Sequence, residues 1–398
     1  KEYRRQRQMC IRDRNNKFMR YLASVGISSI ANNILTLTVY WYVLYETNSI
    51  AVLALTGFVQ SIPILFTFAI SFLVRNIGAK KLMFIGDAAR ALMAILFIVN
   101  IFSFESIAVV IMINVVNETA ELIHTSATTS IIPTLVNGDE ITESVGISNA
   151  TISVFELIGT VIGGFFYDAF GAKFLAILIF VFFSCAAVIV WGIKITSIVN
   201  DSDCENGNGF NIKFILGNGL LVGVIVLSLL INIVMSPFDL MITTHIKTVF
   251  NAGASAYSIL DGMLMSGMIV GSLLVGLIVG KKELKKVIKV LFALLGIAII
   301  LMGISMNFLA SSVIIFIIGA TMALIDSSLD AFLLHILPDE NRDRVFAFLT
   351  ALMTATVPIG TGMFSVYINL AKTSYIFCVI GVVIVIFACM YGIIDRNK

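Results

Sequence analysis

The chain contains one short pattern twice, first as SIIPTLVNGDE at residues 130–140 and again as HILPDENRDR at residues 335–344. In each copy an apolar run ends at a proline and an acidic loop follows. The next apolar run then carries Ile-Gly-Thr, at residues 158–160 and 359–361. The offsets between the copies are 205 and 201 residues, so a loop difference of four residues reconciles them. This shared order predicts a duplicated unit, with chance similarity between apolar helices as the alternative.

The composition requires a lipid environment. Hydrophobic residues make up 59% of the 398 residues, charged residues make up 13%, and the mean hydropathy is +1.02. A water-facing surface cannot carry so much apolar side chain. A membrane-spanning helix needs about 20 mainly apolar residues. Twelve such runs are predicted, at residues 18–44, 51–74, 82–102, 107–134, 146–166, 172–195, 214–236, 254–280, 287–305, 308–336, 345–370 and 374–394.

The predicted fold class is an all-α integral membrane protein with twelve transmembrane helices in two pseudo-symmetric six-helix bundles. The bundles are expected at residues 15–195 and 214–398. Residues 196–213, TSIVNDSDCENGNGFNIK, have too few apolar side chains to bury and are expected to be a cytoplasmic linker. Residues 1–14, KEYRRQRQMCIRDR, begin without Met and are expected to be an artefactual or disordered stretch.

Basic residues predict the orientation, because they remain on the cytoplasmic side of short loops. With both termini inside, 22 of the 26 Lys and Arg residues lie on cytoplasmic segments. Lys173, Lys247 and Lys372 lie outside, and Arg90 lies within a span. The expected location is a bacterial plasma membrane, crossed many times, with both termini cytoplasmic.

The fourth predicted helix concentrates polar residues on one face. At three- and four-residue spacing these are Asn114, Asn117, Glu118, Glu121 and His124. A charged side chain at the bilayer centre costs about 2.5–3.5 kcal/mol on insertion scales. Two carboxylates one turn apart in a low dielectric cannot both stay charged without a large penalty. The pair is therefore predicted to bind and release protons, with a structural hydrogen bond as the alternative.

Acidic residues elsewhere extend this prediction. Asp326 lies twelve residues before Pro338, as Glu121 does before Pro133, so the repeat places both carboxylates at one height. Asp239 and Asp261 are expected near the outer face, in contact with water. The predicted proton-coupling residues are Glu121, Glu118, Asp326 and Glu156. The predicted substrate cavity contains Asn117, Asn114, Asn32, Asn33, Thr36 and Asp330, and bonds to neighbouring helices are the alternative for the polar groups of the first helix.

The fifth predicted helix resembles a signature of the major facilitator superfamily. Gly146, Gly159, Gly163 and Gly164 match glycines of its antiporter motif, and Phe155 and Thr160 replace a Gly and the Pro. The chain resembles the macrolide-efflux-like and siderophore-exporter-like branch of drug:proton antiporters over residues 17–395. The resemblance implies alternating access and export. Glycines let two helices approach backbone to backbone, so Gly159, Gly163 and Gly164 are predicted gating residues, with simple close packing as the alternative.

A second match is the loop between the second and third helices. Ser71, Leu73, Gly78, Lys80 and Lys81 follow the family pattern, whereas Arg75 stands where the family has an Asp. Asp87 and Arg90, one turn into the third helix, also resemble the branch. Three residues apart on a helix, they share a face and can neutralise each other. A structural and gating role is predicted for this pair, with substrate contact as the alternative.

The sequence gives no support for catalysis. It has no zinc-type HExxH, no phosphate-binding glycine loop and no nucleophile elbow, and its five cysteines show no paired spacing. No enzyme activity, cofactor, metal or nucleic-acid partner is expected. The predicted function is a monomeric secondary transporter that exports a bulky amphipathic compound, macrolide- or drug-like, in exchange for protons. The alternatives are a dedicated exporter of an endogenous metabolite such as a siderophore or peptide, and a non-transporting scaffold or immunity component.

Overall fold

The computed structural model describes the chain except residues 1, 68–76, 137–139, 194–218, 279–283, 337–338, 369 and 397–398. In the described part the chain forms helices joined by short turns, without strands. The predicted linker and Arg75 lie outside these residues. Two compact units are present, and each is considered by itself: residues 1–48 with 59–203, and residues 49–58 with 204–398.

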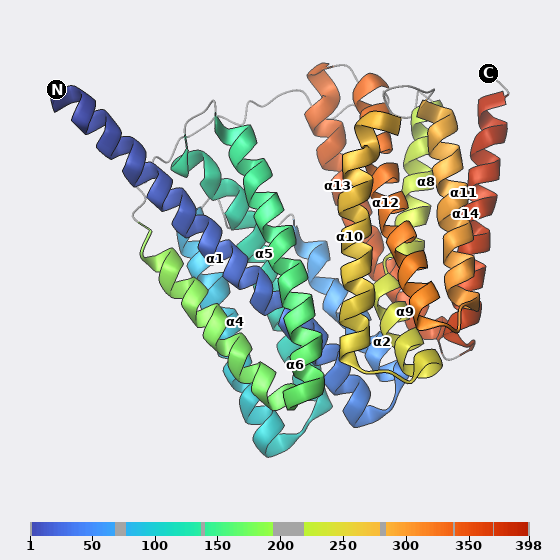
Figure 1. Cartoon of the computed structure of the whole chain (residues 1–398), viewed down its shortest axis with the longest axis horizontal. Coiled ribbons are helices and arrows are strands. Elements are labelled where there is room, and N and C mark those ends of the chain that lie inside the picture. Colours follow the sequence, from blue (N-terminus) through green and yellow to red (C-terminus); the bar gives the residue numbers. More distant parts are fainter. Residues whose placement is uncertain are drawn as a thin grey trace. The chain divides into compact units, whose positions relative to one another are not determined.

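The helices of the first half are drawn from blue to green in Figure 1. They are α1 (Glu2–Thr47), α2 (Ile50–Ser61) with η1 (Ile62–Phe66), α4 (Ala79–Val99) with η2 (Asn100–Phe104), α5 (Ile107–Leu135) and α6 (Ile141–Trp191). The second half contains α8 (Gly219–Met235), α9 (Phe238–His245) with η4 (Ile246–Phe250), α10 (Ala254–Ile278), α11 (Leu284–Ile304), α12 (Phe308–Ile336), α13 (Asp339–Tyr367) and α14 (Thr373–Arg396).

These helices account for the twelve predicted crossings. Nine described helices are long and apolar enough to span a membrane, and two shorter apolar helices are also present. One of the nine, residues 143–191, contains two predicted helices because α6 is kinked at Gly171, where φ is 74°. The described helices thus provide twelve crossings. The chain is therefore a multi-pass membrane protein with the predicted all-α architecture.

Two predicted boundaries differ from the structure. The seventh helix was expected to end at residue 236, yet helical structure resumes at Phe238 and continues to Phe250. Pro237 has no N–H to offer the carbonyl of Ile233, and Ser236 Oγ donates to that carbonyl instead at 3.0 Å. The proline therefore bends the span without ending it. At the N-terminus, α1 begins at Glu2, ahead of the expected start of the first span at residue 18.

The duplicated Ile-Gly-Thr elements pack in the same way in both units. A Cβ on Gly159 of α6 would lie 2.9 Å from the carbonyl oxygen of Ile30 on α1. A Cβ on Gly360 of α13 would collide with the carbonyl oxygen of Ile233 on α8. Ile30 and Ile233 are 203 residues apart, and Gly159 and Gly360 are 201 apart. Each glycine thus admits the first helix of its own half, which supports the internal repeat.

The core of the first unit joins four helices. Tyr21 of α1, Met83 of α4 and Ile131 of α5 are almost fully buried together with Val190 of α6. The hydroxyl of Tyr21 donates to the carbonyl oxygen of Thr128 at 3.1 Å. This apolar packing fixes α4 and α5 side by side, and the polar residues of both helices then share one interior.

Candidate functional site

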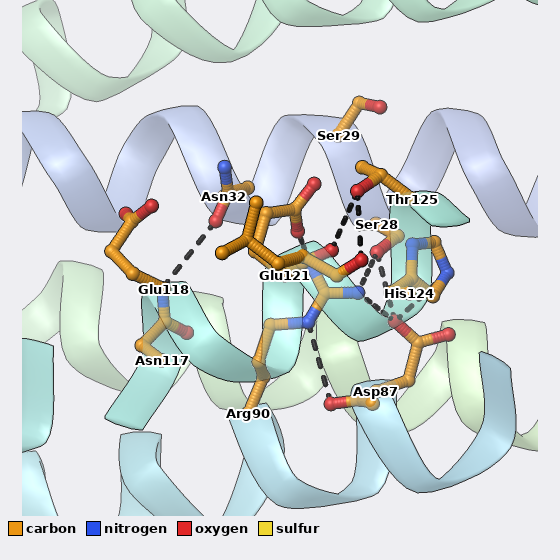
Figure 2. A network of polar contacts seen from close by, with 12 residues as sticks. Ser28, Ser29, Asn32, Asp87, Arg90, Asn117, Glu118, Glu121, His124 and Thr125 are labelled. Carbon is orange, nitrogen blue, oxygen red and sulfur yellow. Dashed lines mark hydrogen bonds and ion pairs between the residues drawn. The ribbon is translucent and has the colours of Figure 1, made fainter. Parts of the chain in front are cut away.

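Arg90 of α4 is the centre of a buried charge network. Its side chain is fully buried, and its Nη2 lies 2.5 Å from Asp87 Oδ1. Its Nη1 forms an ion pair with Glu121 Oε2 of α5. The guanidinium carbon also lies 4.6 Å from the ring centre of Phe183 on α6. Figure 2 shows Arg90, Asp87 and Glu121 pointing toward one another. One buried cation therefore serves two carboxylates from different helices.

Ser28 connects this network to α1. Its Oγ accepts a hydrogen bond from Arg90 Nη2 at 2.8 Å and donates one to Asp87 Oδ1 at 2.8 Å. His124 of α5 approaches from another side, with Nε2 3.5 Å from Asp87 Oδ1. Among the described atoms, Asp87 Oδ2 and His124 Nε2 have no hydrogen-bond partner. Buried polar atoms are usually paired, so the network retains capacity to gain a proton or a bond.

A glycine explains why α4 and α5 come close enough to share Arg90. A Cβ on Gly86 would lie 3.0 Å from His124 Cβ and 3.2 Å from the carbonyl oxygen of Ala120. Gly86 precedes Arg90 by four residues, so it lies one turn below it on the same face. The missing side chain lets α5 approach, and Glu121 then meets the guanidinium.

Glu118 of α5 is held by neutral partners. Its Oε1 accepts a hydrogen bond from Gln60 Nε2 of α2 at 2.6 Å. Gln60 Oε1 accepts a second bond from Asn114 Nδ2 at 2.9 Å. The two predicted carboxylates of α5 are thus held differently, since Glu121 pairs with a cation and Glu118 is bonded to an amide.

The predicted cavity asparagines bond to neighbouring helices in this conformation. Asn117 Nδ2 donates to Asn32 Oδ1 of α1 at 3.4 Å, and Asn117 is fully buried. Thr160 Oγ1 of α6 donates to Asn33 Oδ1 at 3.5 Å. Thr36, one turn beyond Asn32, is half-buried. The alternative of interhelical bonding is therefore realised, and the cavity role of these side chains stays a prediction.

The other acidic residues are distributed over both units. Glu156 of α6 is half-buried, and its charge interacts with that of Glu121. Asp326 and Asp330 lie on α12 in the second unit; Asp326 is exposed, and the side chain of Asp330 is not among those described. Asp261 is buried, so the expectation that it contacts water was wrong, whereas Asp239 is exposed.

Whether Glu121 and Asp326 lie at equal height along their helices depends on the residue from which the position is counted. Glu121 lies 14 residues after the start of α5 at Ile107, and Asp326 lies 18 after the start of α12 at Phe308. The difference of four residues is about one helical turn. The carboxylates match only when counted from the prolines.

The predicted gating residues have clear packing partners. Asp87 and Arg90 form the predicted ion pair. Gly159 faces Ile30 of α1, and Gly163 faces Ile34. Gly164, the residue after Gly163, is also buried. These glycines allow α6 to pack along α1. Their role in gating stays a prediction.

Sequence reasoning missed Gln60, Phe183 and the pairing of Arg90 with Glu121. A lone Gln in the apolar run of α2 was a usable signal for Gln60. No periodicity within one helix reports which residue of another helix it faces, so the Arg90–Glu121 pair had no such signal. The same limit applies to Phe183.

Comparison with known proteins relates this multi-pass chain to membrane transporters. The sequence model of the Major Facilitator Superfamily matches residues 220–397. The chain is 21% identical over 397 residues to Macrolide efflux protein A of Streptococcus pyogenes, covering 96% of each chain.

Solved structures show the same fold. The nucleoside transporter NupG superposes with a TM-score of 0.80 at 10% identity, covering 96% of this chain and 100% of NupG. A bacterial homologue of the iron transporter ferroportin in its inward-facing state gives a TM-score of 0.67 at 11% identity, covering 94% of this chain and 98% of the homologue. The C-terminal half of the chain thus matches the Major Facilitator Superfamily, and the whole chain has the fold of solved membrane transporters.

Proposed function

We propose that the protein exports a bulky amphipathic compound, macrolide- or drug-like, in exchange for protons by alternating access. The observation that carries this proposal is the pair of α5 carboxylates, Glu118 and Glu121, inside a membrane-spanning unit, beside the buried cation Arg90. The similarity to a macrolide efflux protein over nearly the whole chain favours export of this class of compound.

The charges suggest how protons couple to transport. Arg90 balances one of its two carboxylate partners, Asp87 and Glu121, and Glu118 adds a further negative charge. Protonation of Glu118 removes that charge from the membrane interior. A proton bound on one side and released on the other thereby biases the two access states of the transporter.

The remaining residues receive supporting roles in this proposal. Asp87 and Arg90 hold α1, α4 and α5 together and act in gating, with Gly159, Gly163 and Gly164 at the contact between α1 and α6. Glu156 and Asp326 are further proton sites. Asn117, Asn114, Asn32, Asn33, Thr36 and Asp330 are the proposed substrate contacts.

The proposed setting follows from the distribution of basic residues. A monomer in a bacterial plasma membrane, with both termini in the cytoplasm, places most Lys and Arg side chains on the inner side. The protons and the small-molecule substrate then move in opposite directions across this membrane.

The test is efflux of a fluorescent macrolide or cationic dye from proteoliposomes, with and without an imposed pH gradient. The parent protein should transport faster with the gradient. The gradient-driven rate of Glu118→Gln should be at least tenfold lower than that of the parent protein, because a permanently neutral amide cannot exchange a proton.

Thr119→Val is the matched control, since Thr119 is exposed and its hydroxyl donates within α5 to the carbonyl oxygen of Val115. It should retain the parent rate. Equal rates with and without the gradient in the parent protein would refute proton exchange, and absence of any flux in folded protein would favour the scaffold alternative.

A further inference from the structure

Gln60 stands between the two polar residues of α5 that are one turn apart. Its Nε2 donates to Glu118 Oε1 at 2.6 Å, and its Oε1 accepts from Asn114 Nδ2 at 2.9 Å. Asn114 is 1% exposed, and Gln60 and Glu118 are half-buried. The three side chains form a short hydrogen-bonded chain from α5 to α2 and back.

The direction of these bonds matches an ionised Glu118. A carboxylate only accepts hydrogen bonds, whereas a protonated carboxyl group can also donate one. A primary amide has a donor end and an acceptor end, so Gln60 can serve either form by turning over. Asn114 can follow, because its Oδ1 is buried without a hydrogen-bond partner among the described atoms and can accept the bond that Gln60 would then donate.

Gln60, and not a charged neighbour of Glu118, is the residue that adapts to the protonation state of Glu118. Arg90 on α4 and Glu121 on α5 both act electrostatically on Glu118. Arg90 is already paired with Asp87 and Glu121, so its charge is largely compensated. On α2, the contact to Glu118 is the neutral amide of Gln60.

We propose that Gln60 is a positioning residue that stabilises the charged form of Glu118 and transmits the protonation of α5 to α2 by reversing its amide. This inference deepens the proposed function, since it assigns the element that responds when the proton binds.

Gln60 lies close in sequence to a segment of α2 that packs on other helices. Residues 49–58 at the start of α2 group with the second unit, and the helix joins the first unit from Val59 onward. A Cβ on Gly57 would collide with the side chain of Leu240 on α9, and Phe58 lies 3.0 Å from the place of a Cβ on Gly362 of α13. Gln60 therefore lies two residues beyond the segment that packs on α9 and α13.

The experiment measures proton binding by Glu118 without requiring transport. A hydrophobic carbodiimide reacts with protonated carboxyl groups, and peptide mass spectrometry separates labelling of Glu118 from labelling of Glu121. The full-length protein in detergent is labelled across a pH series, and the midpoint of Glu118 labelling is recorded. Thr119→Val, on the exposed face of α5, is the control and should keep the parent midpoint.

Gln60→Met removes the amide at nearly constant length. The midpoint should rise by about one pH unit, because the charged carboxylate loses a hydrogen bond. Gln60→Lys replaces the neutral donor by a cation, so the midpoint should fall. Opposite shifts from one position are not expected from simple loss of packing.

Unchanged midpoints in both folded variants, or a rise in both, would overturn the proposal. Absence of Glu118 labelling in the parent across the series would also overturn it, since Glu118 would then bind no proton. If the midpoints shift as expected but parent efflux ignores the pH gradient, the assignment of Gln60 stands and the proposed proton exchange fails.

Discussion

Helices α4 and α11 have the same length and bury the same face, yet among the described side chains only α4 carries charge on that face. Each has 21 residues, and their starts and ends are both 205 residues apart. At this offset the buried residues Leu82, Met83, Gly86, Asp87, Arg90, Ala94 and Phe97 coincide with Val287, Ile288, Leu291, Phe292, Leu295, Ile299 and Met302. Asp87 and Arg90 thus correspond to Phe292 and Leu295, which are 0% and 1% exposed.

This difference teaches that the repeat preserved packing and not chemistry. Packing needs a buried stripe at helical spacing, which apolar residues provide equally well. An ion pair in the same stripe also needs polar partners, which the first unit supplies with Ser28 and Glu121. Ser28 itself corresponds to Ile231 at the 203-residue offset of the first helices. The charge network around Arg90 therefore belongs to one half.

The largest effect is expected from removing the only cation of the network described here. Arg90→Leu copies the residue type of α11, but it leaves the buried Asp87 and the half-buried Glu121 without a compensating cation. Breaking a buried ion pair in this way costs about 3–5 kcal/mol. The measurement is the free energy of unfolding in mixed micelles.

The matched control is the triple variant Arg90→Leu, Asp87→Asn, Glu121→Gln, which removes all three charges. It should be markedly more stable than Arg90→Leu alone. Equal destabilisation of the two would mean that the packing of the Arg90 side chain matters, and not its charge.

A smaller effect should distinguish the two glycine contacts of the repeat. Gly360→Ala forces a Cβ into the carbonyl of Ile233, whereas Gly159→Ala meets Ile30 at 2.9 Å. Overpacking costs about 1–3 kcal/mol, and Gly360→Ala should lie higher in this range than Gly159→Ala. Thermal unfolding of both variants checks the order. Gly146→Ala is the control, since nothing lies within 4 Å of its Cβ position.

The smallest effect is expected at Ser28. Ser28→Ala removes one donor and one acceptor from Asp87 and Arg90 but leaves their ion pair intact. A loss of about 1 kcal/mol is expected, measured in the same unfolding assay. Ser272→Ala, whose hydroxyl is exposed and bonds within α10, should lose less. Equal losses of unfolding free energy would mean that the contact of Ser28 with the network stabilises the protein no more than an exposed hydroxyl does.

The sequence predicted those features that depend on one helix at a time. The prolines and Ile-Gly-Thr elements indicated the repeat, and the spacing of Asp87 and Arg90 indicated their pairing. Contacts between helices were not predictable in this way, because the register of α5 against α4 is decided by the absent side chain of Gly86. The extension of the seventh span beyond Pro237 was missed for a local reason, since the Ser236 hydroxyl satisfies the carbonyl that proline leaves open.

The kink at Gly171 joins two crossings with a single residue of non-helical backbone. Its positive φ is a conformation in which a β-carbon would be strained, so glycine is the natural residue there. No spacer separates the descending and ascending arms of this helical hairpin. During biosynthesis the two arms are therefore expected to partition into the bilayer together, as one preassembled insertion unit.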